Sequence, residues 1–128
     1  MIAPQDLKID NLVLFNSKFV TVSSIIHQEN GYMVEFYCDG FKNRVPIEDI
    51  YPIELNPSIL EKCGFDVTSK GFYQHPNWYN VSLKYLRGTY NLRCNFMDIV
   101  ANNIDYLHQL QNLYYTLTGE ELIYNYDI

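Results

Sequence analysis

The chain has 128 residues, of which 48% are hydrophobic and 19% are charged, so it holds enough apolar material for one domain or for two small lobes sharing a core. A composition this apolar excludes a generally disordered chain. The formal net charge is −6 and both halves of the sequence are acidic, which disfavours a broad phosphate-binding surface and suits a basic partner.

The first fifty residues predict a series of short strands. Four runs rich in apolar, β-branched and aromatic residues follow one another closely, at residues 12–15, 19–26, 32–37 and 41–45. Breaks at Asn16 and Ser17, at Asn30 and Gly31, and at Asp39 and Gly40 separate them, and such residues tolerate the positive φ of hairpin turns. Pro46 ends the last strand because it cannot donate a ladder hydrogen bond. We therefore expect residues 1–55 to form a β-rich lobe, either a Src-homology-3-like barrel or a bent meander.

A short helix is predicted to follow this lobe. Asn56 is a good N-terminal cap, Pro57 suits the first helical position, and Gly64 is suited to end the helix. The apolar stripe of this helix consists of Ile59, Leu60 and Cys63.

The second half predicts further strands and then one longer helix. The strands are expected at residues 71–74, 81–86 and 89–96, with Gly88 in the turn between the last two. The helix is expected at residues 103–117, because apolar residues recur at helical spacing in Ile104, Leu107, Leu110, Leu113, Tyr114 and Leu117.

The ends of this longer helix also carry signals. Asn102 or Asn103 is expected to cap its start, Asp105 to lie near the positive end of the helix dipole, and Gly119 to stop it. A final strand is expected at residues 122–126. The predicted fold class is therefore α+β, with an N-terminal lobe at 1–55 and an α+β lobe at 56–128, in which helix 103–117 covers a small antiparallel sheet. The two lobes are expected to form one compact unit.

Several stretches of the chain carry a resemblance to known proteins. They are residues 7–13, 52–55, 59–65 and, most specific, the sequence LHQLQNLY at 107–114 running into LTGEEL at 117–122. The sequence of these stretches resembles that of small proteins of phages and mobile elements in Bacteroidota-type bacteria. Residues 66–100 show no such resemblance. The resemblance implies a setting rather than a mechanism, and in that setting small acidic proteins often inhibit host defence, including RNA-guided nucleases.

The residues that could support metal binding or catalysis are scattered. Cysteines and histidines occur singly and without metal-binding spacing, at Cys38, Cys63, Cys94, His27, His75 and His108. The only conceivable nucleophile and base are Cys63 and His108, which lie on different predicted helices. Solvated faces explain the carboxylate groups, which are Glu48 with Asp49, Glu120 with Glu121, and Asp98 with Asp105. We expect no metal, no cofactor and no enzymatic activity.

Aromatic residues crowd the second half and form the candidate partner-binding site. The candidate residues are Phe72, Tyr73, His75, Trp78, Tyr79, Tyr85, Arg87 and Tyr90. They suit a protein interface, in which Trp and Tyr dominate the binding energy, but they suit an internal core equally well. A third interpretation is stacking of single-stranded bases, assisted by Lys70, Lys84, Arg87 and Arg93. A second candidate surface is an amide-rich helix face comprising Gln109, Gln111, Asn112 and Thr116.

Together these patterns predict a non-enzymatic, protein-binding accessory protein of a phage or mobile element. The expected activity is inhibition of a host defence nuclease, in the manner of anti-CRISPR proteins, by direct binding to a basic nucleic-acid-handling protein. The alternatives are an adaptor or structural interaction module, or a single-stranded nucleic-acid binder. The isolated cysteines and the absence of a signal or membrane segment in this sequence lead us to expect the cytoplasm of a bacterial host.

Overall fold

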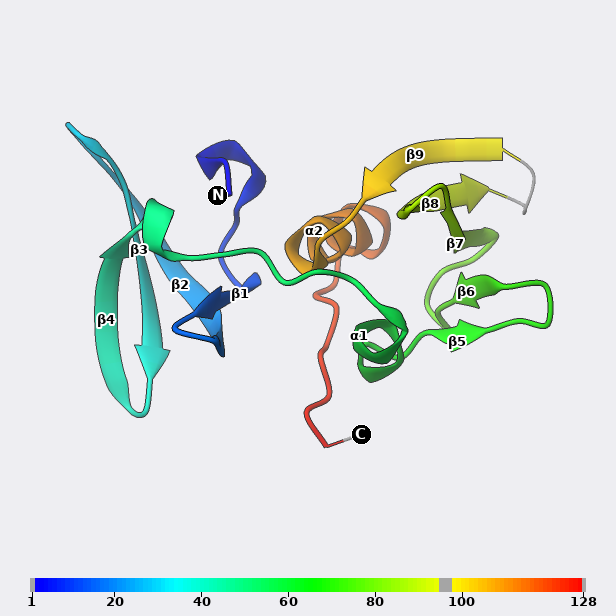
Figure 1. Cartoon of the computed structure of the whole chain (residues 1–128), viewed down its shortest axis with the longest axis horizontal. Coiled ribbons are helices and arrows are strands. Elements are labelled where there is room, and N and C mark those ends of the chain that lie inside the picture. The colour runs from blue at the N-terminus through cyan, green and yellow to red at the C-terminus, as the bar shows by residue number, and fades with distance from the viewer. Residues whose placement is uncertain (1, 95–97, 128) are drawn as a thin grey trace. The chain divides into compact units, whose positions relative to one another are not determined.

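The computed structural model describes residues 2–94 and 98–127, which form an α+β fold (Figure 1). This confirms the predicted fold class. The strands of the described residues form two antiparallel sheets, of order β1-β2-β3-β4 and β5-β6-β7-β8-β9. The chain divides into two units. The first comprises residues 1–54 and 106–112, and the second comprises residues 55–105 and 113–128.

The first unit contains the four-stranded sheet, two 3₁₀ turns and the first part of α2. Its elements are η1 (Pro4–Asp6), β1 (Leu12–Phe15), β2 (Lys18–Gln28), β3 (Gly31–Cys38), β4 (Phe41–Pro46) and η2 (Ile47–Asp49). The long strand β2 pairs with β1 through its first half and with β3 through its second, with an irregularity between Val22 and Ser24. The core of this unit is apolar, with Ile2, Leu7, Val13, Val20, Val22, Val34, Phe36, Ile47 and Ile50 buried.

The sheet of the first unit is an open meander in the part of the chain that the structure describes, and it does not close into a barrel. Of the two predicted forms, the meander is therefore the one found. A single bridge between Leu14 and Tyr51 extends the pairing of β1 beyond its neighbour β2. Among the described residues, the chain after η2 meets β1 in this bridge alone, so no fifth strand forms on β1.

Two of the three predicted hairpin turns of the first unit are confirmed. Asn16 and Ser17 have φ of 48° and 65°, and Asp39 and Gly40 have φ of 54° and 82°, so both turns have the paired positive φ of type I′. The turn predicted at Asn30 and Gly31 is displaced by one residue, because Gln28 pairs with Gly31 and leaves residues 29 and 30 in the turn.

The second unit contains the five-stranded sheet, a short helix and the last part of α2. Its elements are α1 (Pro57–Lys62), β5 (Asp66–Val67), β6 (Phe72–Gln74), β7 (Val81–Leu86), β8 (Thr89–Cys94) and β9 (Asp98–Ile104). Helix α1 begins and ends as predicted, because the Asn56 side chain accepts a hydrogen bond from the Ile59 N–H at 2.9 Å and Gly64 takes a φ of 91°. The β7–β8 turn also has two positive φ values, at Arg87 and Gly88.

The longer helix α2 (Leu107–Thr118) begins four residues later than predicted. The residues expected to start it belong to β9, in which Ile104 pairs with Tyr90 and Ala101 with Leu92. Asn103, one of the two expected caps, has a φ of 58°. Pairing with the buried strand β8 thus outweighs the local capping signal. The end of the helix is as predicted, since Gly119 has a φ of 76° and donates to the Tyr115 carbonyl.

Two further predictions concern the last strands. The strand expected at 89–96 is β8 and ends at Cys94, and Phe96 lies outside the described residues. The strand expected at 122–126 is wrong, because this segment is irregular. It is held instead by a buried Leu122 and by a 2.8 Å hydrogen bond from the Asn125 N–H to the Lys62 carbonyl at the end of α1. The end of a helix offers a few separate carbonyl groups and not the regular row of donors and acceptors of a strand, so residues 122–126 do not form a strand against it.

The packing of α2 on the second sheet stays a prediction. Along this helix Leu107, Leu110 and Tyr114 are buried, whereas Leu117 is exposed. No helix formed by residues 2–94 or 98–127 is long and apolar enough to cross a membrane.

Candidate functional site

The eight predicted partner-binding residues all lie in the second unit, and six of them fall into three different groups. The other two are exposed, Tyr79 in the loop after Trp78 and Arg87 in the β7–β8 turn. The register of the sheet separates the groups. Phe72 pairs with Lys84, and Tyr73 pairs with Leu83, so Phe72 and Tyr73 point to opposite faces. The buried Leu83 marks the face of Tyr73 as the core side of the sheet.

The first group, the aromatic core, consists of Phe65, His75, Trp78 and Tyr114. Trp78 is only 6% exposed, and its ring lies 5.2 Å from that of Phe65 and 6.0 Å from that of Tyr114. The Asn77 side chain donates a hydrogen bond of 2.8 Å to the Tyr114 hydroxyl. Trp78 and His75 therefore serve as packing residues in this unit.

His75 is held by local contacts in this core. Its Nδ1 accepts a hydrogen bond from the Asn77 N–H at 3.1 Å. Burial lowers the pKa of His75, although a hydrogen bond with the Cys63 backbone and the charge of Asp66 act in the opposite direction. The neutral, hydrogen-bonded imidazole has a structural role.

The second group, the tyrosine row, consists of Tyr73, Tyr90 and Tyr85. The Tyr90 ring lies 5.9 Å from that of Tyr73 and 4.8 Å from that of Tyr85. Tyr90 is 4% exposed, and burial raises its pKa to about 12, whereas Tyr85 is 53% exposed. Tyr79 follows Trp78 in the loop and is 88% exposed. Tyr85 is thus exposed to solvent and packs against a buried aromatic ring, and Tyr79 is an exposed aromatic side chain of the loop.

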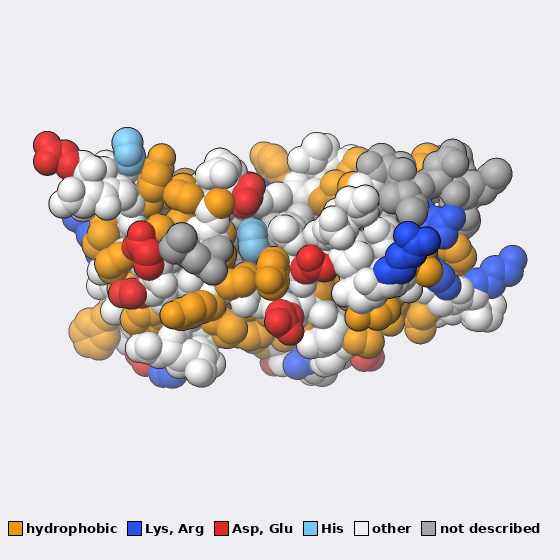
Figure 2. Space-filling model, turned by 45° about the horizontal axis from the view of Figure 1, so that its top comes forward, with side chains coloured by type: hydrophobic (Ala, Val, Ile, Leu, Met, Phe, Trp, Pro, Cys, Tyr) orange, Lys and Arg blue, Asp and Glu red, His pale blue; other side chains and the backbone are white. Residues whose placement is uncertain are grey.

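The third group, the cationic face, lies on the opposite side of the sheet around Phe72. The Lys84 ammonium lies 4.9 Å and the Arg93 guanidinium 5.7 Å from the centre of the Phe72 ring, within cation–π range. Lys84 also donates to the Lys70 carbonyl at 2.6 Å. A cavity of about 420 Å³ beside them is lined by Thr68, Ser69, Lys70 and Phe72. In Figure 2 the blue Lys and Arg side chains gather over this sheet.

A separate groove lies on the second unit between α1 and the edge of the sheet. It encloses about 350 Å³ and is lined by Pro57, Glu61, Phe65, Asp66, Val67 and Tyr73. Only Tyr73 of this set belongs to the predicted site residues. Sequence reasoning missed the groove because its walls come from a helix end, a two-residue strand and a neighbouring strand.

The amide-rich helix face, the other predicted surface, is largely used inside the first unit. The Gln111 side chain accepts a hydrogen bond from the Leu12 N–H, and Asn112 Oδ1 accepts one from the Asn11 side chain, both at 2.8 Å. Asn112 in turn donates to the Asp6 carbonyl at 2.8 Å. The buried Gln111 and the half-buried Asn112 thus attach α2 to the N-terminal segment, and these hydrogen bonds occupy their amide groups within the unit.

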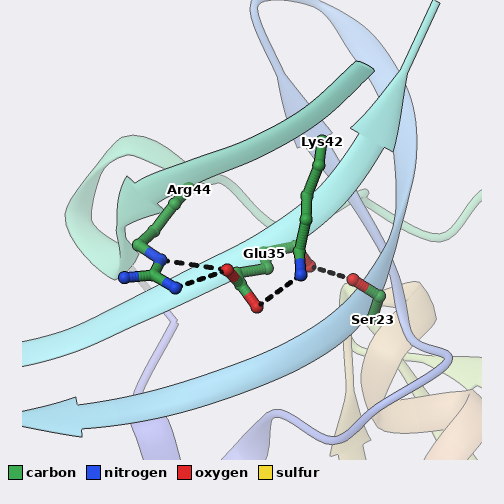
Figure 3. A network of polar contacts seen from close by, with 4 residues as sticks. All are labelled: Ser23, Glu35, Lys42 and Arg44. Carbon is green, nitrogen blue, oxygen red and sulfur yellow. Dashed lines mark hydrogen bonds and ion pairs between the residues drawn. The ribbon is translucent and has the colours of Figure 1, made fainter. Parts of the chain in front are cut away.

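A carboxylate network in the first unit was also missed by sequence reasoning (Figure 3). Glu35 is buried and accepts hydrogen bonds from Arg44 Nε at 2.9 Å and Nη2 at 2.8 Å, with Lys42 Nζ 3.5 Å away. The Arg44 hydrogen bonds, opposed by burial and assisted by Lys42, lower the pKa of Glu35. Counting outward from the predicted turn at Asp39 and Gly40 pairs Glu35 with Arg44, and that register was the available signal.

The two residues considered for catalysis are both buried. Cys63 is buried, and burial raises the pKa of its thiol to about 12, so the thiolate needed for nucleophilic attack is scarce. Cys63 belongs to the second unit and His108 to the first. Across residues 2–94 and 98–127, no three His, Cys, Asp or Glu side chains come close enough to hold a metal ion. The Asp98 side chain lies outside the described part of the chain.

Comparison with known proteins gives no match to a family model, to a curated protein or to a solved structure.

Proposed function

We propose that this protein is a non-enzymatic binding protein that recognises another protein through its second unit. The observation that carries this proposal is the packing of the exposed Tyr85 against the buried Tyr90, and the exposed Tyr79 in the loop adds a second aromatic side chain on the same unit. An exposed tyrosine that already rests on a fixed ring loses little conformational freedom on binding. Tyrosine is also among the residues that dominate the energy of protein interfaces.

Charge supports a basic partner. In the first unit Lys18 lies 3.3 Å from Asp39, while Lys42 and Arg44 lie at the buried Glu35. These cations are therefore neutralised, and other carboxylates of the unit, including Glu48 and Asp49, are exposed. An acidic surface of this kind accelerates the encounter with a basic protein.

Within this proposal the partner is a nucleic-acid-handling protein, and the action is inhibition of a host defence nuclease in the cytoplasm of a bacterial host. The acidity, the small size and the resemblance to phage and mobile-element proteins support it. The adaptor alternative would use the open four-stranded sheet of the first unit.

The test is capture of partners from a host lysate by the immobilised protein, followed by mass spectrometry. We expect a basic nucleic-acid enzyme to be retained by the wild type and lost from the Tyr79→Ser/Tyr85→Ser variant by about tenfold or more, the effect of an interface hot spot. Tyr37→Ser is the control, because Tyr37 is equally exposed but lies in the first unit. If the Tyr79→Ser/Tyr85→Ser variant and the Tyr37→Ser variant retain the partner equally, the proposal that the second unit binds it is refuted.

A second candidate function is binding of single-stranded nucleic acid on the cationic face. The position of Lys84 and Arg93 over Phe72 favours it, because a ring flanked by cations can stack a base beside neutralised phosphates. Filter binding of labelled oligonucleotides at low and moderate salt tests it. Retention that falls with salt and is lost in Phe72→Ser supports this function, and no salt-sensitive retention excludes it.

A further inference from the structure

We propose that the groove between α1 and the sheet edge binds an arginine side chain of a basic protein segment. This inference rests on the proposed function of protein binding and names the chemistry that the second unit recognises. The groove, called here the acidic groove, is lined by Pro57, Glu61, Phe65, Asp66, Val67 and Tyr73.

The end of α1 builds the floor of the acidic groove. The Phe65 N–H donates to the Leu60 carbonyl at 3.0 Å and the Gly64 N–H to the Glu61 carbonyl at 2.9 Å, which is the hydrogen-bond pattern of a Schellman motif. Gly64 permits this reversal because its φ is 91°. The motif turns Phe65 back toward the helix and sends Asp66 directly into β5. Glu61 on the helix and Asp66 on the strand thereby line the same groove.

The aromatic residues of the acidic groove are held rigidly. Phe65 is buried, and its ring makes edge contacts with His75 at 5.1 Å and with Trp78 at 5.2 Å. Tyr73 is half-buried, with its ring against Tyr90. A ring that is already held in place can offer its π-face to a cation without further ordering.

Both carboxylates of the acidic groove are available to a ligand. Glu61 and Asp66 are exposed, and the structure pairs neither of them with a Lys or Arg of the described chain. The neighbouring Lys62 instead extends toward the Tyr124 ring, 5.9 Å from its centre. The charge of the acidic groove therefore complements a cationic side chain.

Arginine fits this combination better than lysine does. Its planar guanidinium can stack on an aromatic ring and donate several hydrogen bonds to two carboxylates at once, whereas an ammonium is a compact and strongly hydrated charge. A volume of about 350 Å³ suits a single long side chain rather than a folded element. Strand β5 is the outer strand of its sheet, so an extended segment of the partner can lie alongside the groove.

The test titrates the isotope-labelled full chain with a defined probe and follows its backbone amide resonances. The probe is a capped nine-residue Gly-Ser peptide containing two arginines, and the comparison peptides replace both arginines by lysine or by uncharged citrulline. We expect shifts at residues 61–67 and at Tyr73, weaker binding of the lysine peptide, and none of the citrulline peptide. Binding of all three peptides alike, or shifts elsewhere only, would overturn the proposal.

Paired variants separate local recognition from general charge. Glu61→Gln/Asp66→Asn should weaken binding of the arginine peptide about tenfold, the combined effect of losing two solvent-exposed charge-assisted contacts. Glu120→Gln/Asp127→Asn makes the same change in net charge at two exposed positions of the second unit and should leave affinity within about twofold. Equal weakening in both variants would overturn the groove as the site.

The outcome is distinguishable from failure of the proposed function, because the peptide titration needs no partner. Loss of lysate capture in the Tyr79→Ser/Tyr85→Ser variant without any peptide binding would remove the groove and leave the binding function standing. Binding of the peptide to the groove, with no partner captured from lysate by the wild type, would support the groove and refute the proposed binding function. A melting curve for each variant confirms that the substituted protein is folded.

Discussion

The buried ionisable side chains Glu35 and His108 differ in how far their polar atoms are hydrogen-bonded. Glu35 is fully engaged by Arg44 and Lys42, so its charge is retained in a buried position. His108 is also buried, stacks on the Tyr106 ring at 5.9 Å, and has no hydrogen-bond partner at Nδ1. Burial lowers the pKa of His108 below its ordinary value of 6.5, with the charge of Asp6 opposing the effect. These two environments predict different responses to acid.

We predict that the free energy of unfolding decreases as the pH falls below about 6.5, because the unfolded chain then binds protons that the half-buried His75 and the buried His108 do not bind in the folded state. Stability from these residues is complete above the unfolded pKa and is lost as pH falls toward the folded pKa. A further loss below about 4.5 is expected from Glu35, whose folded pKa is lowered. Urea unfolding at pH 7, 6 and 5 measures the first stage. His108→Leu should reduce the fall in the free energy of unfolding between pH 7 and pH 5, whereas His27→Gln, at an exposed site, should leave that fall as it is in the wild type. The same fall in His108→Leu as in the wild type would contradict the prediction.

At the scale of elements, local hydrogen bonds explain where the helices start and stop. Asn56 caps α1 through the Ile59 N–H at 2.9 Å, and Pro57 at the first position loses no helical hydrogen bond. The six residues of α1 are too few to be stable alone, so the cap matters to a helix that also builds the acidic groove.

Asn56→Ala is expected to lower the free energy of unfolding by about 1 kcal/mol, the usual value of a helix N-cap. Ser58→Ala in the same turn is the control, because Ser58 is exposed and does not cap the helix. Urea denaturation of both variants measures the difference, and an equal effect at the two positions would show that the cap contributes nothing.

Helix α2 gives a second prediction at this scale. Leu110 is fully buried, whereas Leu117 on the same helix is 47% exposed. Leu110→Asp would bury an unpaired carboxylate, at a cost of several kcal/mol, comparable with the roughly 5–15 kcal/mol that stabilises a typical domain. We expect loss of the cooperative thermal transition by circular dichroism in Leu110→Asp and its retention in Leu117→Asp. A wild-type melting curve for Leu110→Asp would refute the buried position.

Local chemistry in the sequence was sufficient to predict most elements, and long-range pairing accounts for the failures. The turns at Asp39 and Gly40 and at Gly88 could be predicted because two-residue hairpins need positive φ. The early helix start at 103 was wrong because residues 101 and 104 pair with β8, which no local signal reveals. In the candidate site the sequence showed that aromatic residues are concentrated there. It did not show that Phe72 and Tyr73, as neighbours in one strand, point to opposite faces of the sheet. The acidic groove was invisible because its walls meet only in the folded chain.

For the whole molecule, the distribution of charge and aromatic surface carries the functional argument. The Lys and Arg residues of the first unit that lie near Glu35 and Asp39 neutralise carboxylates there, while Lys84 and Arg93 of the second unit gather over Phe72. The exposed Tyr79 and Tyr85 and the acidic groove belong to the second unit. We therefore propose partner recognition for that unit and a structural role for the Glu35 network.

Hydrogen–deuterium exchange of the protein, alone and bound to the partner captured from lysate, tests the central claim most directly. The account predicts that binding slows amide exchange in the second unit, at residues 61–67, in the 75–80 loop and at residues 85–90. Slower exchange confined to strands β1 to β4 of the first unit, with the second unit unchanged, would contradict it.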